Sequence, residues 1–110
     1  MVNVVYVMSL EPESGKSLVS LGIAETLSQR VERLGYFRPV ISSSPQPDPT
    51  IELMRQRYKL TQTYEESYGI TTDMTRSIGS GADTESLIGT ILAKFESLAS
   101  RCDAVLIEGT

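Results

Sequence analysis

The chain has 110 residues and a formal net charge of −4, with 22% charged and 40% hydrophobic residues. This length predicts a single domain, since domains run roughly 100–200 residues, and the ordinary composition excludes collagen, low-complexity disorder and a disulfide scaffold. The sequence has no histidine and one cysteine, Cys102. These two facts exclude Ser-His-Asp and Cys-His catalysis within the chain, and any internal disulfide.

The acidic balance argues against nucleic acid and anionic membranes as partners. The most apolar run, residues 2–10, is far shorter than the ~20 residues that a membrane-spanning helix needs. It also lacks the basic start and the small-residue cleavage site of a signal peptide. We therefore expect a cytoplasmic protein, and cysteine usage does not point to secretion.

The first forty residues predict a strand, a helix and a second strand. Residues 2–8, VNVVYVM, are typical of a strand covered on both faces in a parallel sheet. Residues 9–15 form a polar turn, and apolar residues at three- and four-residue steps then predict a helix from Lys16 to Leu34. Gly35 stands where a helix C-cap glycine is expected. Residues 36–41, YFRPVI, predict the second strand of a βαβ unit.

The rest of the chain continues this alternation. Residues 42–50 carry three prolines and predict a loop, residues 51–58 a short helix, and residues 61–81 an irregular stretch with at most a short helical piece. An apolar stripe predicts a long helix over residues 83–101, and residues 104–107 a third strand. Alternating strands and helices indicate an α/β fold with a parallel sheet and flanking helices. A three-stranded sheet leaves an unpaired edge, so we expect residues 1–110 to be one incomplete domain, truncated after its third strand, or a domain whose edge another chain completes.

A phosphate-binding signal lies in the turn after the first strand. Gly15, Lys16 and Ser17 stand at a strand-to-helix junction, where a helix N-terminus directs free N–H groups at an anion. Lys16 would meet the phosphates and the Ser17 hydroxyl would bind Mg²⁺, as in a P-loop. Leu10 occupies a position where the strict motif requires glycine. The turn, with Glu13 and Ser14, is therefore expected to bind ATP or another phosphate ligand, the alternative being a basic residue at the start of a surface helix.

Charged residues follow the other strands at the same edge of the sheet. Ligands of open parallel sheets bind beyond the carboxyl ends of the strands. Asp48 follows the second strand and Glu108 the third, so Ser17, Asp48 and Glu108 are the predicted Mg²⁺ ligands. Arg38 is expected to lie close to the phosphates. For Asp48 a solvated loop residue is an equal alternative, and no residue is predicted to be catalytic.

Four other residues receive structural interpretations. Without a histidine to activate it, Cys102 is expected to be a structural thiol rather than a nucleophile. Tyr58, Tyr64 and Tyr68 are expected to pack half-buried rather than to line a pocket.

Several of these segments resemble dethiobiotin synthetase and its relatives, which have a P-loop fold. SLEPESGKS resembles their variant P-loop, with Ser9 in place of the first glycine. FRPV resembles their Lys-Pro-Val/Ile segment, with Arg38 in place of the lysine. The loop residue Asp48 and the Glu-Gly pair at Glu108 also match. The resemblance implies ATP and Mg²⁺ at Lys16, Ser17, Asp48 and Glu108.

A closer resemblance is to the N-terminal domain of long-form bacterial phosphate acetyltransferases, which has the same fold. It is carried by YVMSLEPESGKSLVSLGIAETL, YFRPV, ELMRQRY, YGIT and RCDAVLIEGT. It implies a regulatory or assembly role, a C-terminal acetyl-transfer domain in the same protein, and a homo-oligomer. The alternatives are an ATP-dependent ligase or amidase, of the dethiobiotin synthetase or cobyrinic acid amide synthase type, and a P-loop relic that serves only oligomer contacts.

Overall fold

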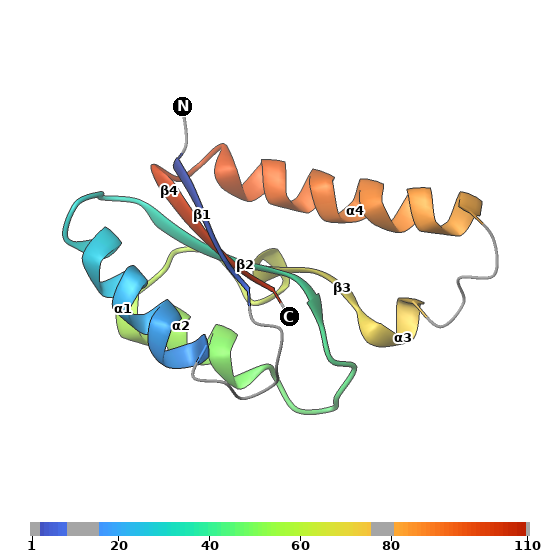
Figure 1. Cartoon of the computed structure of the whole chain (residues 1–110), viewed down its shortest axis with the longest axis horizontal. Coiled ribbons are helices and arrows are strands. Elements are labelled where there is room, and N and C mark those ends of the chain that lie inside the picture. Colours follow the sequence, from blue (N-terminus) through green and yellow to red (C-terminus); the bar gives the residue numbers. More distant parts are fainter. Residues whose placement is uncertain (1–2, 9–15, 76–80, 110) are drawn as a thin grey trace.

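The computed structural model describes residues 3–8, 16–75 and 81–109, and it shows a parallel sheet with helices on both faces (Figure 1). The strands are β1 (Asn3–Met8), β2 (Leu34–Ile41), β3 (Tyr68–Thr71) and β4 (Ala104–Gly109). The helices are α1 (Lys16–Ser28), α2 (Pro49–Tyr58), α3 (Thr72–Thr75) and α4 (Gly81–Ala99), with a 3₁₀ turn at Glu65–Ser67. The strand order is β1-β4-β2-β3 and every pair is parallel. The predicted α/β fold with flanking helices is confirmed.

The alternation of side chains along β2 and β4 divides the core between the two faces of the sheet. Tyr36 and Leu106 point to the face covered by α1 and α2, where they pack with Ile51 and Met54. Their chain neighbours Phe37 and Val105 point to the face covered by α4 and pack with Leu98. Because successive strand residues face opposite sides, strands covered on both faces read as continuous apolar runs.

The first helix is shorter than predicted, and Gly35 is not its C-cap. α1 ends at Ser28, and Gly35 lies inside β2, opposite Val105 of β4. A Cβ atom on Gly35 would lie 2.7 Å from the Sγ of Cys102. Glycine is therefore needed here for the close approach of the segment before β4, and not for helix termination.

The sheet has four strands among the described residues, and the sequence predicted three. β3 lies within the stretch expected to be irregular, so the predicted third strand is β4. β3 has only four residues and contains Gly69, so its β-propensity signal is weak. A Cβ atom on Gly69 would lie 2.5 Å from the backbone oxygen of Pro39, which explains why this strand carries a glycine. None of the helices described is long and apolar enough to cross a bilayer.

Candidate functional site

The carboxyl ends of β2 and β4 bring three polar side chains together around the hydroxyl of Tyr36. Tyr36 lies in β2 opposite Leu106, and Glu108 lies two residues further along β4 on the same face. The Tyr36 hydroxyl donates a 2.9 Å hydrogen bond to Oε1 of Glu108. Both side chains are buried. Burial, followed by the charge of Glu108, raises the pKa of Tyr36 far above its ordinary value, so the hydroxyl stays protonated and serves as a donor.

Arg38 and Asp48 form the second part of this cluster. Nη1 of Arg38 lies 2.7 Å from Oδ2 of Asp48, and both side chains are largely buried. Oδ1 of Asp48 accepts hydrogen bonds from the backbone N–H groups of Thr50 and Ile51. Asp48 is thus the N-cap of α2, with Pro49 in the first turn, and the sequence Asp-Pro-Thr favours this arrangement. Nε of Arg38 is buried and has no hydrogen-bond partner within the part of the chain that the structure describes.

The predicted phosphate-binding residues are covered by the structure only in part. Glu13, Ser14 and Gly15 lie outside the described residues. Lys16 and Ser17 are the first two residues of α1, which contacts β1 and β4. The start of a helix at Lys16 agrees with the predicted strand-to-helix junction. The structure describes the backbone of Lys16 and Ser17 but not their side chains.

The contacts of Asp48 limit its suitability as a magnesium ligand. One of its oxygens caps α2 and the other binds the Arg38 guanidinium. A Mg²⁺ ion on Oδ2 would have to displace that guanidinium or share the oxygen with it, at a cost in charge repulsion. The described residues hold no group of three or more acidic or cysteine side chains with metal-binding geometry. As arranged here, Asp48 positions Arg38 and does not present an open carboxylate.

Tyr36 is the member of this cluster that sequence reasoning missed. Its place in YFRPVI predicts only a strand residue, because an aromatic residue inside an apolar run is usually core. A signal was nevertheless present, since a tyrosine hydroxyl that is buried usually finds a polar partner. Glu108, two residues beyond the strand position opposite Tyr36, is that partner.

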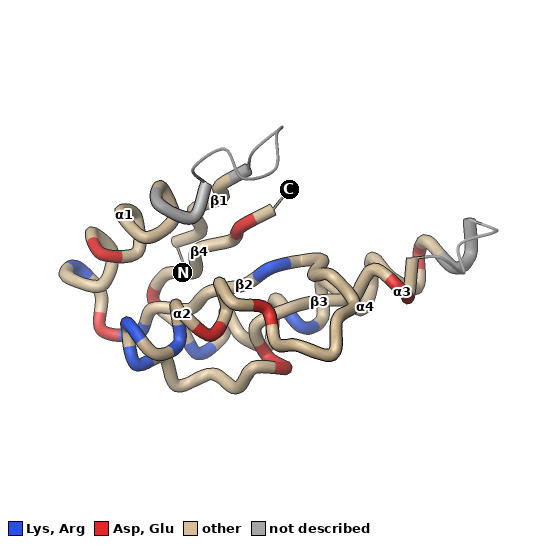
Figure 2. Tube along the Cα trace, turned by 90° about the horizontal axis from the view of Figure 1, so that it is seen from below, with Lys and Arg blue, Asp and Glu red and all other residues tan. Residues whose placement is uncertain are grey.

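The charged residues of the described chain are interspersed rather than gathered by sign. Figure 2 shows Lys and Arg mixed with Asp and Glu along α1, α2 and the strands. Several of them pair, as Arg57 does with Glu25 across α2 and α1. A phosphate ligand at the carboxyl edge would therefore depend on a few cations, of which Arg38 is the one with described contacts.

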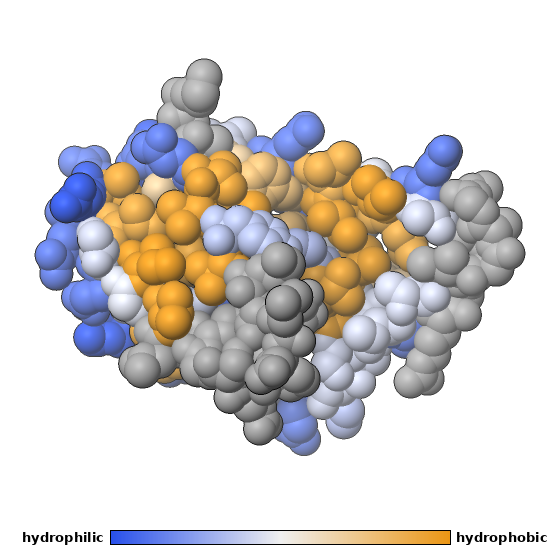
Figure 3. Space-filling view, viewed as in Figure 1, coloured by the Kyte–Doolittle hydropathy of each residue, from blue (hydrophilic) through white to orange (hydrophobic). Residues whose placement is uncertain are grey.

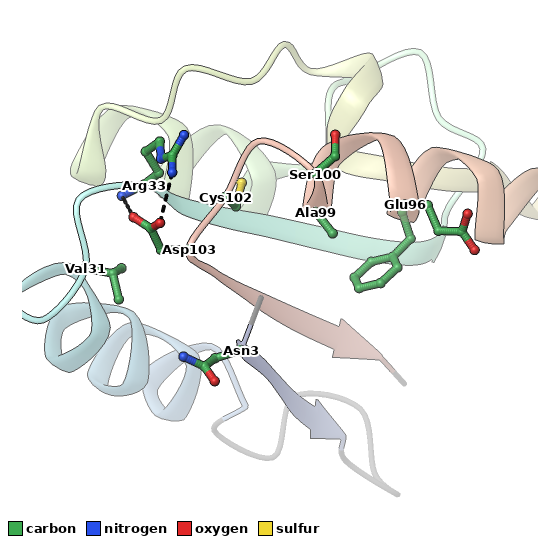
Figure 4. Close-up of a pocket in the computed structure, with 9 residues that line it drawn as sticks. Asn3, Val31, Arg33, Glu96, Ala99, Ser100, Cys102 and Asp103 are labelled. Carbon is green, nitrogen blue, oxygen red and sulfur yellow. Dashed lines mark hydrogen bonds and ion pairs between the residues drawn. The ribbon is translucent and has the colours of Figure 1, made fainter. Parts of the chain in front are cut away.

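A pocket of about 670 Å³ lies at the opposite, amino-terminal end of the sheet (Figure 4). Asn3, Phe95 and Cys102 line it together with Arg33 and Asp103. The Arg33 guanidinium lies 3.2 Å from Asp103, whose pKa is lowered first of all by the hydrogen bond from the Arg33 backbone N–H. Burial raises the pKa of the Cys102 thiol, which agrees with the predicted structural role. The pocket thus offers no activated nucleophile among its lining side chains.

Tyr58, Tyr64 and Tyr68 are half-buried, as expected. Tyr58 donates to the backbone oxygen of Leu21, and the rings of Tyr64 and Tyr68 pack edge to face, 5.6 Å apart. Tyr64 and Tyr68 also line a pocket of about 420 Å³ at the ends of β2 and β3. The expectation that they would not line a pocket is therefore wrong for these two residues.

A family model described as an AAA domain matches residues 3–110. The chain belongs to this AAA domain family. Over its full length the chain is also similar to two enzymes named phosphate acetyltransferase, at 35% identity to the one from Synechocystis sp. and 33% to the one from Nitratidesulfovibrio vulgaris. In both cases the chain spans 16% of the relative's length.

Proposed function

We propose that this AAA-family chain is a segment of a cytoplasmic phosphate acetyltransferase, and that it binds a phosphate-bearing ligand to regulate the enzyme. The full protein would transfer an acetyl group between coenzyme A and phosphate through a separate C-terminal domain. The similarity of the whole chain to two such enzymes supports the parentage. The segment's own role would be ligand binding and assembly of a homo-oligomer.

One observation carries the ligand-binding part of the proposal. Arg38 is fixed by Asp48 at the edge of the sheet, and its buried Nε atom has no partner among the described residues. Buried polar groups are normally hydrogen-bonded, and an exception in a native fold needs an explanation. A phosphate oxygen is a fitting acceptor for this guanidinium. Lys16 and Ser17, at the start of α1, would supply the P-loop contacts to the same ligand.

Magnesium has a secondary place in this proposal. We assign the ion to Ser17 and Glu108. Asp48 would join them only if the Arg38 guanidinium left Oδ2 of Asp48 and bound the ligand instead. Binding of ATP or ADP would then depend on Mg²⁺ less strongly than in a P-loop protein with an open loop carboxylate. The nucleotide could regulate the enzyme only by binding one conformation more tightly than another.

Calorimetric titration of the full-length protein with ATP and with ADP, each with and without Mg²⁺, tests the proposal. We expect weak binding that is lost in both Lys16→Ala and Arg38→Ala. The matched control is Arg57→Ala, which removes an exposed α2 arginine whose partner is Glu25. This control should bind as the wild-type protein does.

The other outcomes each identify an alternative. If titration with neither nucleotide produces heat, the chain would be a P-loop relic that serves only oligomer contacts. Tight binding accompanied by ATP hydrolysis would favour the ligase or amidase type. Binding that survives Arg38→Ala would show that the Arg38 cluster is structural only.

A further inference from the structure

Lys94 of α4 places its ammonium group against an aromatic ring rather than a carboxylate. Its Nζ atom lies 4.3 Å from the centre of the Tyr68 ring in β3, and it forms no ion pair with the described carboxylates. Lys94 is the one basic residue of α4, and Figure 3 shows largely hydrophobic surface along this helix on the face in view. Among the described residues, the ammonium is therefore held by a cation–π contact.

The packing of α4 on β3 explains the position of Lys94. A Cβ atom on Gly69 would lie 2.9 Å from Cγ1 of Ile91 and 3.3 Å from its Cα atom, so the missing side chain of Gly69 lets α4 lie directly on β3. Lys94 follows Ile91 by about one turn of the helix, and residues at this spacing are neighbours on one face. It therefore reaches Tyr68, which precedes Gly69 in β3.

Burial changes the chemistry of the Lys94 amine. Its side chain is half-buried, and desolvation lowers the pKa of the ammonium, although the charge of Glu65 opposes this shift. A larger fraction of the amine is then neutral at physiological pH, and the neutral amine is the nucleophile. Lys59 provides a contrast within the same chain, since it is exposed at the end of α2.

A pocket of about 330 Å³ lies beside Lys94, and its lining includes Leu98 and Arg101. Nε of Arg101 donates to the backbone oxygen of Ser97, and Nη2 donates to the carboxylate of Glu66. Nη1 of Arg101 has no acceptor within the described part of the chain. Because a guanidinium with free N–H groups is suited to phosphate, the pocket combines an amine nucleophile with a cation for a phosphate group.

We propose that Lys94 is a site of acetylation by an acyl phosphate, with Arg101 binding the phosphate that leaves. The amine nitrogen attacks the carbonyl carbon of acetyl phosphate, an N–C bond forms, and the bond between that carbon and the bridging oxygen breaks. The phosphate departs with the electron pair and takes up the proton that the amine loses. The inference rests on the proposed function for the supply of acetyl phosphate, which transfer of an acetyl group from coenzyme A to phosphate produces.

Acetylation would act on the contact between α4 and the edge strand β3. An acetylated lysine has no charge and makes no cation–π contact, and α4 packs mainly on β3. The modification would therefore loosen α4 from β3. The product of the full-length enzyme would thus change the packing of the segment that we propose to regulate it.

Incubation of the full-length protein with acetyl phosphate, followed by peptide mass spectrometry, tests this proposal. Lys59 is the control within the same molecule. We expect the initial rate of acetylation at Lys94 to exceed that at Lys59 by at least about threefold, because more of the Lys94 amine is neutral. Equal rates, or a faster rate at Lys59, would overturn the proposal.

A second reagent tests the part assigned to Arg101. Acetic anhydride acetylates amines without releasing phosphate. Arg101→Gln should therefore lower the ratio of the Lys94 rate to the Lys59 rate more strongly with acetyl phosphate than with acetic anhydride. An unchanged ratio with acetyl phosphate, or an equal fall with both reagents, would overturn the phosphate contact.

Incubation with acetyl-coenzyme A and phosphate, in place of acetyl phosphate, separates this inference from the proposed function. Acetylation of Lys94 by added acetyl phosphate only would support the inference and overturn the proposed acetyl-transfer activity. If the protein forms acetyl phosphate and Lys94 stays unmodified, the proposed activity stands and the inference fails. Acetyl-coenzyme A without phosphate is the control for direct transfer from the thioester.

Hydrogen exchange of the β3 amides measures the structural consequence. Lys94→Gln removes the charge as acetylation does, whereas Lys94→Arg keeps a cation for the Tyr68 ring. We expect faster exchange in Lys94→Gln and in the acetylated protein, but not in Lys94→Arg, because the opening of β3 becomes easier when α4 is held less firmly. Equal exchange in the two variants would overturn the predicted loosening.

Discussion

The hydroxyl of Tyr36 donates a 2.9 Å hydrogen bond to the carboxylate of Glu108, and both side chains are buried between the sheet and the helices α1 and α2. This bond connects β2 to β4 at the carboxyl ends of the strands, beside the Arg38–Asp48 ion pair. A buried carboxylate is costly unless it is hydrogen-bonded. The tyrosine is therefore part of what allows an acidic residue to stand at the end of an apolar strand.

Replacing Tyr36 by phenylalanine tests this relationship. Tyr36→Phe keeps the ring but removes a hydrogen bond to a buried acceptor, which should lower the free energy of opening by about 1–3 kcal/mol. Hydrogen exchange of the β2 and β4 amides in the full-length protein measures this loss. Tyr58→Phe is the control, since its hydroxyl lies outside the cluster. An unchanged exchange rate in Tyr36→Phe would show that the bond contributes nothing.

The same tyrosine predicts a loss of stability in alkali. Burial and the charge of Glu108 raise the pKa of Tyr36 in the folded chain, whereas an unfolded tyrosine has a pKa of about 10. The contribution is complete below about pH 10 and declines as the pH rises further, because the unfolded chain then releases a proton that the folded chain retains. As the pH rises through this range, the midpoint temperature of thermal unfolding should fall less steeply in Tyr36→Phe than in the wild-type protein. Identical slopes would contradict the assignment.

β3 pairs with β2 only from Arg38 onward. Before that point, the side chain of Gln62 takes the place of a neighbouring strand and bonds the β2 backbone. Its side chain accepts from the Tyr36 backbone N–H at 2.9 Å and donates to the Tyr36 carbonyl at 2.6 Å. Gln62→Leu leaves both backbone groups unpaired in a buried place and should cost about 2–4 kcal/mol. Chemical denaturation of the full-length protein checks this, with Gln56→Leu on the exposed face of α2 as control. Equal midpoints for the two variants would refute the bridging role.

The contact between Gly35 and Cys102 predicts coupled effects. A Cβ atom on Gly35 would lie 2.7 Å from Sγ of Cys102, so Gly35→Ala should destabilise the protein by about 1–3 kcal/mol through overpacking. Cys102→Ala removes the obstructing sulfur, and the double variant should recover part of the loss in a double-mutant cycle. Additive losses would contradict this explanation.

A helical glycine provides the contrasting case. Gly22 in α1 has open space where a Cβ atom would lie. Gly22→Ala should therefore stabilise the protein by about 0.5–1 kcal/mol, because alanine loses less backbone freedom on folding. The same denaturation measurement serves both glycines. If Gly22→Ala were destabilised, helix propensity would not be what determines the effect of substitution at this position.

The parts of the fold that could be predicted were those with a strong periodic signal. β1 and β4 each consist mainly of consecutive apolar residues, at 4–8 and 104–107, and α4 carries a long apolar stripe. β3 could not be predicted, because its four residues include Gly69, which is needed for the approach of the Pro39 backbone. Such an approach depends on tertiary packing and leaves no local pattern.

The candidate site was predictable in position but not in its contacts. Glu108 and Asp48 were expected at the ends of strands, since topology alone brings those ends to one edge. The Arg38–Asp48 pair depends on how the β2–α2 loop closes, and the Tyr36–Glu108 bond on the register of two strands distant in sequence. The capping role of Asp48 had a local signal, in the Pro49-Thr50 that follows it.

The acetyl-transfer activity proposed for the full-length protein, measured as a rate with and without ATP or ADP, tests the central claim most directly. The quantity to compare is the ratio of the two rates in the wild-type protein, in Arg38→Ala and in the Arg57→Ala control. The account predicts a ratio that departs from one in the wild-type protein and in Arg57→Ala, and that returns to one in Arg38→Ala. A ratio of one in the wild-type protein, or an unchanged response in Arg38→Ala, would contradict it.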